Sequence, residues 1–349
     1  MFFDRDDAMA QASHPPSPEL IHLDAAAQMW SKQTGATQRC TLGADIMNTD
    51  HCMKVYLSRR AAITVAALAI LLAVAPRANA DEAAPRSPGQ SLGIVSVPNL
   101  RDVGGYATGD GRVVRMGLLY RSDQLNPISP DDLKKIVALG LNTDFDLRTA
   151  DERSARPDKL PAGITNVWLN VLADADQSSL ARLEKLLLDP KQANAALGGG
   201  KAEAMFEQAY RDFVSLPSAK TAYRRLFLSL GESDNPSLFH CTTGKDRTGW
   251  AAAALLSLLG VPRDKVMEDF LRSNDYILPA YKKTIDAFVA AGGDEEIMTA
   301  LLGVKSDYLQ ASFDEVQSKY GSIDLYFSEG LGIDAKGQTA LRNFYLAKQ

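Results

Sequence analysis

The chain has 349 residues, 43 acidic against 38 basic side chains and a formal net charge of −5. This weakly acidic balance argues against nucleic-acid binding as the main role, because such binding depends on a basic surface. Two of the three cysteines, Cys40 and Cys52, and three of the four histidines lie in the first 52 residues. The one cysteine and one histidine that follow cannot form a disulfide or a Cys/His zinc site, and we expect no metal and no cofactor.

Residues 53–80 have the three parts of a secretory signal peptide. A basic start that ends at Arg60 precedes an uncharged apolar run over residues 61–75, and a small-x-small cleavage pattern ends at Ala80. The run is shorter than the roughly 20 residues that a membrane-spanning helix needs. We expect an exported protein, periplasmic or secreted, that is cleaved near Ala80 and has no stable membrane anchor.

Residues 1–52 precede this signal and show no sustained hydrophobic periodicity. Because a signal peptide acts at an N-terminus, we interpret residues 1–52 as a misassigned upstream segment that does not fold, with translation starting at Met53 or Met47. Residues 81–349 have the length of one domain.

Short apolar runs between turn signals predict four strands in the first half of this domain. They cover residues 93–97, 117–120, 141–147 and 167–172. Ser129 and Pro130 provide the cap and the first position of a helix that Gly140 closes.

Residues 178–230 are expected to form helices in three pieces, broken by the glycines 198–200 and by Leu216-Pro217. A strand over residues 237–240 and a series of helices up to residue 347 follow. Because strands alternate with helices, we predict an α/β fold with a mainly parallel central sheet flanked by helices, a helical insertion and a helical C-terminal part.

The sequence HCTTGKDRTG, residues 240–249, lies between the last predicted strand and a helix. The N–H groups of a short loop that leads into a helix N-terminus converge on one point and create positive potential there. Arg247 could hold two phosphate oxygens, and the same field would stabilise a thiolate at Cys241. A nucleophile and an anion-binding loop would thus share one short segment.

Two other interpretations of this loop are weaker. A Walker-A loop needs glycine where Phe239 stands and serine or threonine where Asp246 stands. A cysteine buried at a strand end is common, but it does not explain the glycine, the arginine and the helix start that follow.

The loop resembles the His-Cys-x5-Arg-Ser/Thr sequence of the protein tyrosine phosphatase superfamily. More narrowly, it resembles the bacterial tyrosine and dual-specificity phosphatases with an HCxxGKDRTG loop, some of which also act on phosphoinositides. Further matches are Asn99–Tyr106, Tyr120–Ser122, Asp146–Arg148 with Glu152, and residues 320–323 and 329–332. The resemblance covers most of residues 93–345 and implies a tyrosine-phosphatase-like fold.

The resemblance implies a cysteine-dependent phosphomonoester hydrolase with a cysteinyl-phosphate intermediate. Cys241 would attack phosphorus, Arg247 and the loop amides would bind the equatorial oxygens, and Thr248 would donate its hydroxyl to the sulfur. Substrates would be phosphorylated proteins or phosphoinositides, with the choice among them and the oligomeric state left open. The expected substrate-binding residues are Thr242, Thr243, Gly244, Lys245, Arg101, Asp102 and Arg148.

The leaving oxygen needs a proton, and His240 is expected to orient the loop from behind the cysteine, so an aspartate is the expected general acid. The first candidate is Asp246, which could instead simply favour a helix N-terminus. Asp146 is the second candidate, and Asp174 or Asp176 is the third.

Several of these residues have plainer interpretations. Lys245 would suit a substrate with a second phosphate, but a solvated loop cation fits equally, and ion pairing explains Arg101, Asp102 and Arg148 almost as well. A rhodanese-like sulfurtransferase also uses a single reactive thiol, and a non-catalytic phosphate-binding module would need no thiol. The Gly-Lys-Asp-Arg-Thr-Gly sequence favours a phosphate dianion as the ligand, which argues against a sulfurtransferase. The presence of both Cys241 and Arg247 argues against a module that only binds phosphate.

Overall fold

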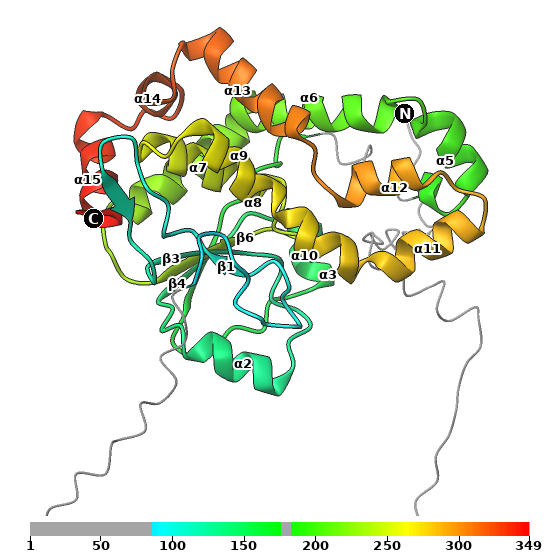
Figure 1. Ribbon diagram of the computed structural model, residues 1–349, viewed down its shortest axis with the longest axis horizontal. Helices are drawn as coiled ribbons and strands as arrows, with labels where there is room; N and C mark the ends of the chain where they lie inside the picture. The colour runs from blue at the N-terminus through cyan, green and yellow to red at the C-terminus, as the bar shows by residue number, and fades with distance from the viewer. Residues whose placement is uncertain (1–85, 176–182, 184, 349) are drawn as a thin grey trace, which may run out of the picture. The chain divides into compact units, whose positions relative to one another are not determined.

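The computed structural model describes residues 86–175, 183 and 185–348 (Figure 1). The predicted upstream segment, the signal peptide and residues 176–182 lie outside this part of the chain. A five-stranded sheet has the order β1 (Arg101–Asp102), β3 (Leu119–Ser122), β6 (Ser237–His240), β4 (Thr143–Asp146) and β5 (Thr165–Trp168). Only β1 is antiparallel to its neighbour in this sheet, so the predicted mainly parallel α/β sheet is confirmed.

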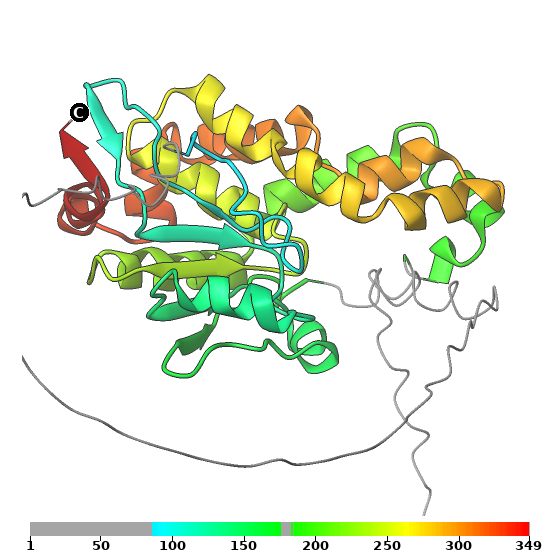
Figure 2. The same cartoon turned by 60° about the horizontal axis from the view of Figure 1, so that its bottom comes forward.

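The two faces of the sheet pack in different cores, because successive side chains of a strand point to opposite sides. On β6, Leu238 lies in a cluster with Ile136 of helix α2 (Pro130–Val137). The next residue, Phe239, lies in the main core with Trp250 of α8 (Arg247–Leu258). Helices therefore cover both faces, with α2 on the opposite side from α8 (Figure 2). Ser129 accepts a hydrogen bond from the backbone N–H of Asp132, which confirms the predicted cap of α2.

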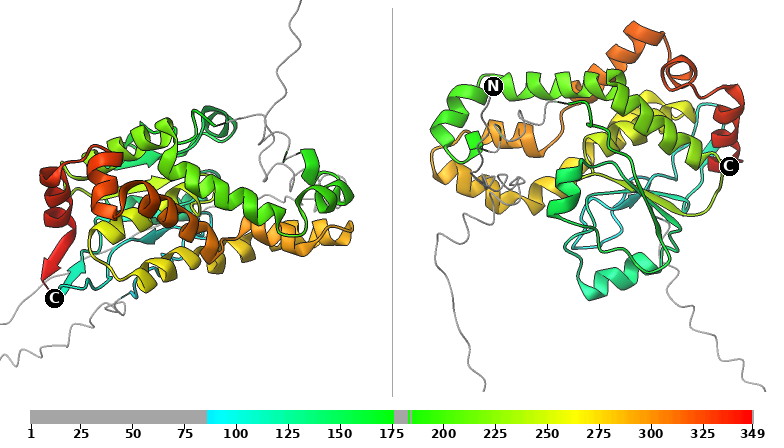
Figure 3. Two further views of the ribbon diagram at one scale, coloured as in Figure 1. Left: turned by 90° about the horizontal axis from the view of Figure 1, so that it is seen from above. Right: turned by 180° about the vertical axis from the view of Figure 1, so that it is seen from behind.

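The predicted helical insertion and helical C-terminal part are also confirmed for the described residues. The remaining helices are α3 (Ala150–Ala155), α5 (Pro190–Leu197), α6 (Lys201–Ser215), α7 (Pro217–Leu230), α9 (Arg263–Leu271), α10 (Ser273–Ala280), α11 (Lys282–Ala290), α12 (Glu295–Leu302), α13 (Ser306–Tyr320), α14 (Ile323–Leu325), the π-helix η1 (Tyr326–Gly330) and α15 (Ala335–Tyr345). Helices α6 and α13 lie side by side (Figure 3). Among the described residues, no helix combines the length and the apolar character that a bilayer crossing requires.

The predicted strand over residues 93–97 is wrong, because this segment forms turns. Gly93 has a φ of +68°, and the backbone N–H of Val97 donates to Ile94 O at 3.1 Å. Ile94 and Val97 are both buried in the cluster beside α2. The apolar character of the segment thus comes from two buried anchors of a turn and not from a strand.

The structure also corrects two boundaries. The chain does not stay helical to residue 347: Leu346–Lys348 form strand β7, which pairs with the unpredicted strand β2 (Arg112–Val114). The strand predicted over residues 167–172 is β5, which begins and ends earlier. Both errors involve short strands whose pairing partners are distant in the sequence, so no local pattern marks their ends.

Candidate active site

Within the sequence HCTTGKDRTG, residues 241–246 form a loop between β6, which ends at His240, and α8, which begins at Arg247. Cys241 directly follows β6 with a buried side chain, and Arg247 is the first residue of α8. The flanking strands β3 and β4 both run parallel to β6, so the loop lies at their carboxyl ends. Ligands of open α/β sheets bind at this edge, which places the loop where a binding site is expected.

The carbonyl groups at the start of the loop are held by donors outside it. The pairs are Cys241 O with His240 Nδ1 (3.2 Å), Thr242 O with Gln124 N (3.1 Å), Thr243 O with Asn99 Nδ2 (2.9 Å) and Gly244 O with Arg121 Nη2 (2.9 Å). In a planar trans peptide the N–H points opposite to the C=O, so these contacts direct the following N–H groups inward. No described residue accepts a hydrogen bond from the N–H groups of residues 242–246, and they remain available to an anion.

Gly244 is required by both its conformation and its surroundings. Its φ is +67°, and a Cβ at this position would lie 2.2 Å from the carbonyl oxygen of Ser122. Arg121, the neighbour of Ser122, donates to Gly244 O from the same strand. The loop therefore packs directly against the Tyr120–Ser122 segment.

Arg247 is held by a glutamate on a neighbouring helix. Its Nη1 and Nη2 donate to Glu152 Oε2 and Oε1, each at 2.6 Å. Glu152 lies in the first turn of α3, where it also accepts from the N–H of Thr149 in a capping box. This end-on pairing leaves the Nε side of the guanidinium without a hydrogen bond to a described residue, and Nε with Nη2 can still bind two phosphate oxygens.

The charges of this pair are fixed by their contacts. Burial disfavours ionised Glu152, but the charge of Arg247 and hydrogen bonds from Arg247 and Thr242 outweigh it and hold the pKa of Glu152 far below its ordinary value. Burial likewise opposes the charge of Arg247, and the charge of Glu152 overcomes it and raises the pKa of Arg247. The loop thus keeps a permanent cation beside its amides.

Thr248 has a fully buried hydroxyl that makes no hydrogen bond to any residue the structure describes. Buried hydroxyl groups are normally hydrogen-bonded. The predicted hydrogen bond from Thr248 to the Cys241 sulfur is therefore not formed in this structure, and the role of the hydroxyl stays a prediction.

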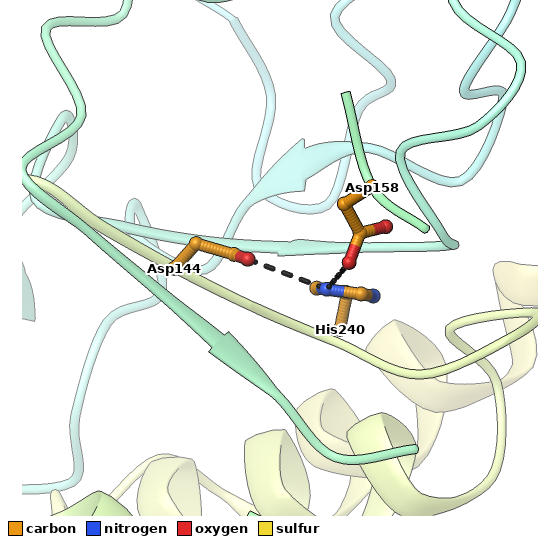
Figure 4. A group of neighbouring side chains, drawn as sticks. All are labelled: Asp144, Asp158 and His240. Carbon is orange, nitrogen blue, oxygen red and sulfur yellow. Dashed lines mark ion pairs between the residues drawn. The ribbon is translucent and has the colours of Figure 1, made fainter. Parts of the chain in front are cut away.

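His240 lies behind the loop in a buried group of charges. Figure 4 shows Asp144 and Asp158 on two sides of its ring, each with a carboxylate oxygen 3.4 Å from Nε2. Burial opposes a charged imidazole, but the charges of Asp144 and Asp146 outweigh it and raise the pKa of His240 well above its ordinary value. A protonated ring would carry a hydrogen on Nδ1 that Cys241 O can accept at 3.2 Å, whereas Nε2 makes no hydrogen bond to a described residue.

Asp146 belongs to the same group. Its carboxylate accepts from Arg148 Nε at 2.9 Å and from Arg153 Nε at 2.8 Å. Burial would raise the pKa of Asp146, but the charge of His240 and the contacts with Arg148 hold it far below the ordinary range. We call the set of His240, Asp144, Asp146, Asp158, Arg148 and Arg153 the β4 network. The network brings three carboxyl groups together with two guanidinium groups and one imidazole.

The ligand atoms of Asp144, Asp158 and His240 lie within 4.8 Å of one another, a spacing that a metal ion could bridge. Arg148 Nη2 already contacts both Asp146 and Asp158. A divalent ion would lie beside this guanidinium and would need a neutral imidazole. A metal at this position would have to share Asp158 with the guanidinium of Arg148.

Asp246 has different surroundings. Its side chain is 18% exposed, and its Oδ1 accepts from Lys245 Nζ at 2.8 Å and from Tyr210 OH at 3.0 Å. The Lys245 side chain is only 2% exposed, and its Nζ lies 4.5 Å from the centre of the Phe206 ring. The predicted role of Lys245 as a substrate-facing cation does not fit this covered position.

The other predicted residues lie away from the loop surface. Arg101 is fully buried and pairs with Asp269, and Asp102 accepts from the N–H groups of Gly104 and Gly117. Arg148 lies in the β4 network. We therefore assign Arg101, Asp102 and Arg148 to support of the site and not to its rim. Asp174 is exposed and bonds to Ser218, and Asp176 lies outside the described residues.

Several residues of the site were not predicted from sequence. Asn99 and Arg121 lie within the matched motifs and Glu152 is the acid that follows Arg148, but the sequence alone indicates no role for these three residues. Asp269, which binds Arg121 at 2.7 Å, and Tyr210 belong to no motif. Only their position in the fold connects them with the loop.

Comparison with known proteins agrees with this geometry. Residues 92–347 match the model of the tyrosine phosphatase family. The chain is 33% identical over 278 residues to a protein of Cupriavidus necator whose name assigns it provisionally to the tyrosine-protein phosphatases, covering 79% of this chain and 94% of that protein. It is 31% identical over 255 residues to the triple specificity protein phosphatase PtpB of Mycobacterium tuberculosis, covering 66% and 90%. The chain belongs to the tyrosine phosphatase family.

Proposed function

We propose that this protein is a cysteine-dependent phosphatase that hydrolyses phosphotyrosine in proteins through a cysteinyl-phosphate intermediate. The observation that carries the proposal is the loop itself: Cys241, the unbonded N–H groups of residues 242–246 and Arg247 lie in one short segment between β6 and α8. The pairing of Arg247 with Glu152 supports it, because it fixes the guanidinium while leaving one side for phosphate.

In the first step the Cys241 thiolate attacks phosphorus, the S–P bond forms and the P–O bond to the leaving group breaks. Asp246 gives its proton to the leaving oxygen. A water molecule then attacks the phosphocysteine and gives a proton to the Asp246 carboxylate. The S–P bond breaks, inorganic phosphate leaves, and Thr248 stabilises the restored thiolate. Arg247 and the loop amides balance the charge of the equatorial oxygens throughout.

Asp246 is preferred to Asp146 as the proton donor on structural grounds. Asp146 is fully buried and bound by two guanidinium groups, so it stays ionised and cannot deliver a proton. Asp246 is partly exposed, and its Oδ2 makes no hydrogen bond to a described residue. It is the aspartate of the loop itself.

The substrate range is part of the proposal. The name of the Mycobacterium relative records a triple specificity for that protein, which supports a substrate range broader than phosphotyrosine here. The family resemblance also implied phosphoinositide substrates, but a second phosphate would need a second cation such as Lys245, and Lys245 is covered by Phe206. We therefore propose phosphoproteins as the main substrates, and a panel of phosphopeptides and phosphoinositides will test this choice.

Cys241→Ser is the decisive variant for the mechanism. We expect it to lower turnover of p-nitrophenyl phosphate by at least about 10⁴-fold. Binding of tungstate, measured by calorimetry, should persist because the loop amides and Arg247 are unchanged. Turnover within about tenfold of the wild type would remove Cys241 from the mechanism. Thiosulfate, tested with the wild type in parallel, should not be consumed, which separates a phosphatase from a sulfurtransferase.

We also propose that the protein is exported after cleavage near Ala80. The basic start, the apolar run and the small-x-small pattern of residues 53–80 support this. Mass spectrometry of protein isolated from cells should find an N-terminus near Asp81. Recovery of cytoplasmic protein that still contains residues 1–52 would contradict both the cleavage and the interpretation of that segment.

A further inference from the structure

We propose that Tyr210 of α6 is a positioning residue for Asp246: its hydroxyl holds one carboxyl oxygen so that the other is presented to the leaving group. This inference deepens the proposed function and rests on Asp246 as the proton donor. It assigns to α6, an element without a recognisable motif, a direct part in the reaction.

The first observation is the contact itself. Tyr210 OH donates to Asp246 Oδ1 at 3.0 Å, between residues that are 36 positions apart in the sequence. Tyr210 is fully buried, and its ring packs against Phe213, Phe270 and Tyr308 at centroid distances of 5.1 to 5.8 Å. The hydroxyl therefore has a fixed position from which to hold the carboxyl group.

The second observation is what Asp246 does not do. It occupies the N-cap position of α8, where an aspartate usually accepts a hydrogen bond from the N–H two or three residues later. Its side chain makes no such bond here. The carboxyl group is instead directed to α6, so the contact with Tyr210 replaces the ordinary local interaction of this residue.

The third observation concerns the second donor. Lys245 Nζ bonds to the same oxygen, Oδ1, at 2.8 Å, and the ring of Phe206, one turn before Tyr210 on α6, covers the ammonium group at 4.5 Å. Both donors converge on Oδ1. Oδ2 makes no hydrogen bond to any residue that the structure describes, and this arrangement leaves it as the oxygen that can carry the proton.

The positioning role predicts a loss that depends on the leaving group. Phenolate needs a proton as the P–O bond breaks, whereas p-nitrophenolate scarcely does. Tyr210→Phe keeps the ring and removes only the hydroxyl. We expect kcat/KM for phenyl phosphate to fall by about tenfold, and that for p-nitrophenyl phosphate to change by less than about twofold.

Tyr308→Phe is the matched control. Tyr308 belongs to the same aromatic cluster, but its hydroxyl donates to Ala300 O at 3.2 Å and does not touch the loop. This variant should leave kcat/KM for both substrates unchanged. Thermal unfolding of the full chain will show that both variants keep their fold.

A double-mutant cycle separates this inference from the proposed function. In the Asp246→Asn background, Tyr210→Phe should cause no further loss, because the two residues act as one unit. Two results would overturn the inference without affecting Asp246 as the proton donor. One is an equal loss of kcat/KM for both substrates in Tyr210→Phe. The other is no loss in Tyr210→Phe while Asp246→Asn loses activity on phenyl phosphate. If Asp246→Asn itself leaves the leaving-group dependence unchanged, the proposed proton donor fails, and the inference with it.

Discussion

Two aspartates of the site, Asp146 on β4 and Asp246 in the loop, lie in opposite environments. Asp146 is part of the β4 network, where Arg148, Arg153 and His240 surround a fully buried carboxylate. Asp246 is part of what we call the α6 contact, the set of Phe206, Tyr210, Lys245 and Asp246, where one carboxyl oxygen is held and the side chain stays partly exposed.

This contrast between Asp146 and Asp246 indicates that the ion pairing and burial of a carboxyl group, and not the residue type, decide whether it can transfer a proton. A carboxylate with several charged donors is fixed in its ionised form and supports the structure. A carboxyl group with one free oxygen can exchange a proton with a substrate. In the proposed mechanism the β4 network supports the loop from behind, and the α6 contact presents the proton donor.

Glu152→Gln should have the largest effect, because Glu152 joins the β4 side of the site directly to Arg247. Loss of its charge and of one hydrogen bond frees the guanidinium to move. A displacement of about 1 Å can lower a rate by roughly 10²-fold. We expect such a loss in kcat/KM for phenyl and p-nitrophenyl phosphate alike. A loss confined to phenyl phosphate would mean that Glu152 acts in proton transfer and not on Arg247.

Asp246→Asn should have the next largest effect and a selective one. Removal of a general acid typically lowers a rate by about 10²-fold. This loss is expected for phenyl phosphate but not for p-nitrophenyl phosphate, and the alkaline limb of the pH dependence of kcat/KM for phenyl phosphate should flatten. If the alkaline limb persists in Asp246→Asn, Asp246 is not the proton donor.

Asp146→Asn tests the other half of the comparison. It leaves Arg148, Arg153 and His240 without their shared carboxylate, and removal of one partner from a buried ion pair destabilises a protein by about 3–5 kcal/mol. We expect this loss in urea unfolding, with the ratio of activities on the two phenyl esters unchanged. A changed ratio in folded protein would return Asp146 to the list of proton donors.

The stability that Asp146 provides should depend on pH. Its folded-state pKa is lowered, so its contribution is complete above the unfolded value of about 3.9 and is lost as the pH falls through the folded value. Urea unfolding between pH 3 and neutrality should show the difference between wild type and Asp146→Asn shrinking towards acid. A difference that is constant with pH would contradict an ionised Asp146.

The smallest expected effect is the pH dependence of stability that comes from His240, the single histidine of residues 86–348. Its pKa is raised in the folded state, so its stabilising charge is complete below the unfolded value of about 6.5 and is lost as the pH rises through the folded value. Carbon-13 NMR of the imidazole should show a charged ring at neutral pH. A midpoint at or below 6.5 would exclude the imidazolium and reopen the metal interpretation of the β4 network.

Much of the sheet and its flanking helices follows from local sequence. The cap at Ser129, the breaks near Gly198 and Leu216, and strand β6 were all predicted from patterns within a few residues. The turn at residues 93–97 and strand β7 were not. Their conformations depend on burial beside α2 and on pairing with β2, and these contacts are formed by distant parts of the chain.

The loop could be predicted from the sequence because its chemistry is local: Cys241, the amides, Gly244 and Arg247 lie within seven consecutive positions between a strand and a helix. The contacts that hold the loop are long-range and become visible in the folded chain. Glu152 meets Arg247 across 95 residues and Tyr210 meets Asp246 across 36. Whether an aspartate gives up a proton depends on the solvent access and the charges that such distant contacts create, and no pattern of neighbouring residues contains that information.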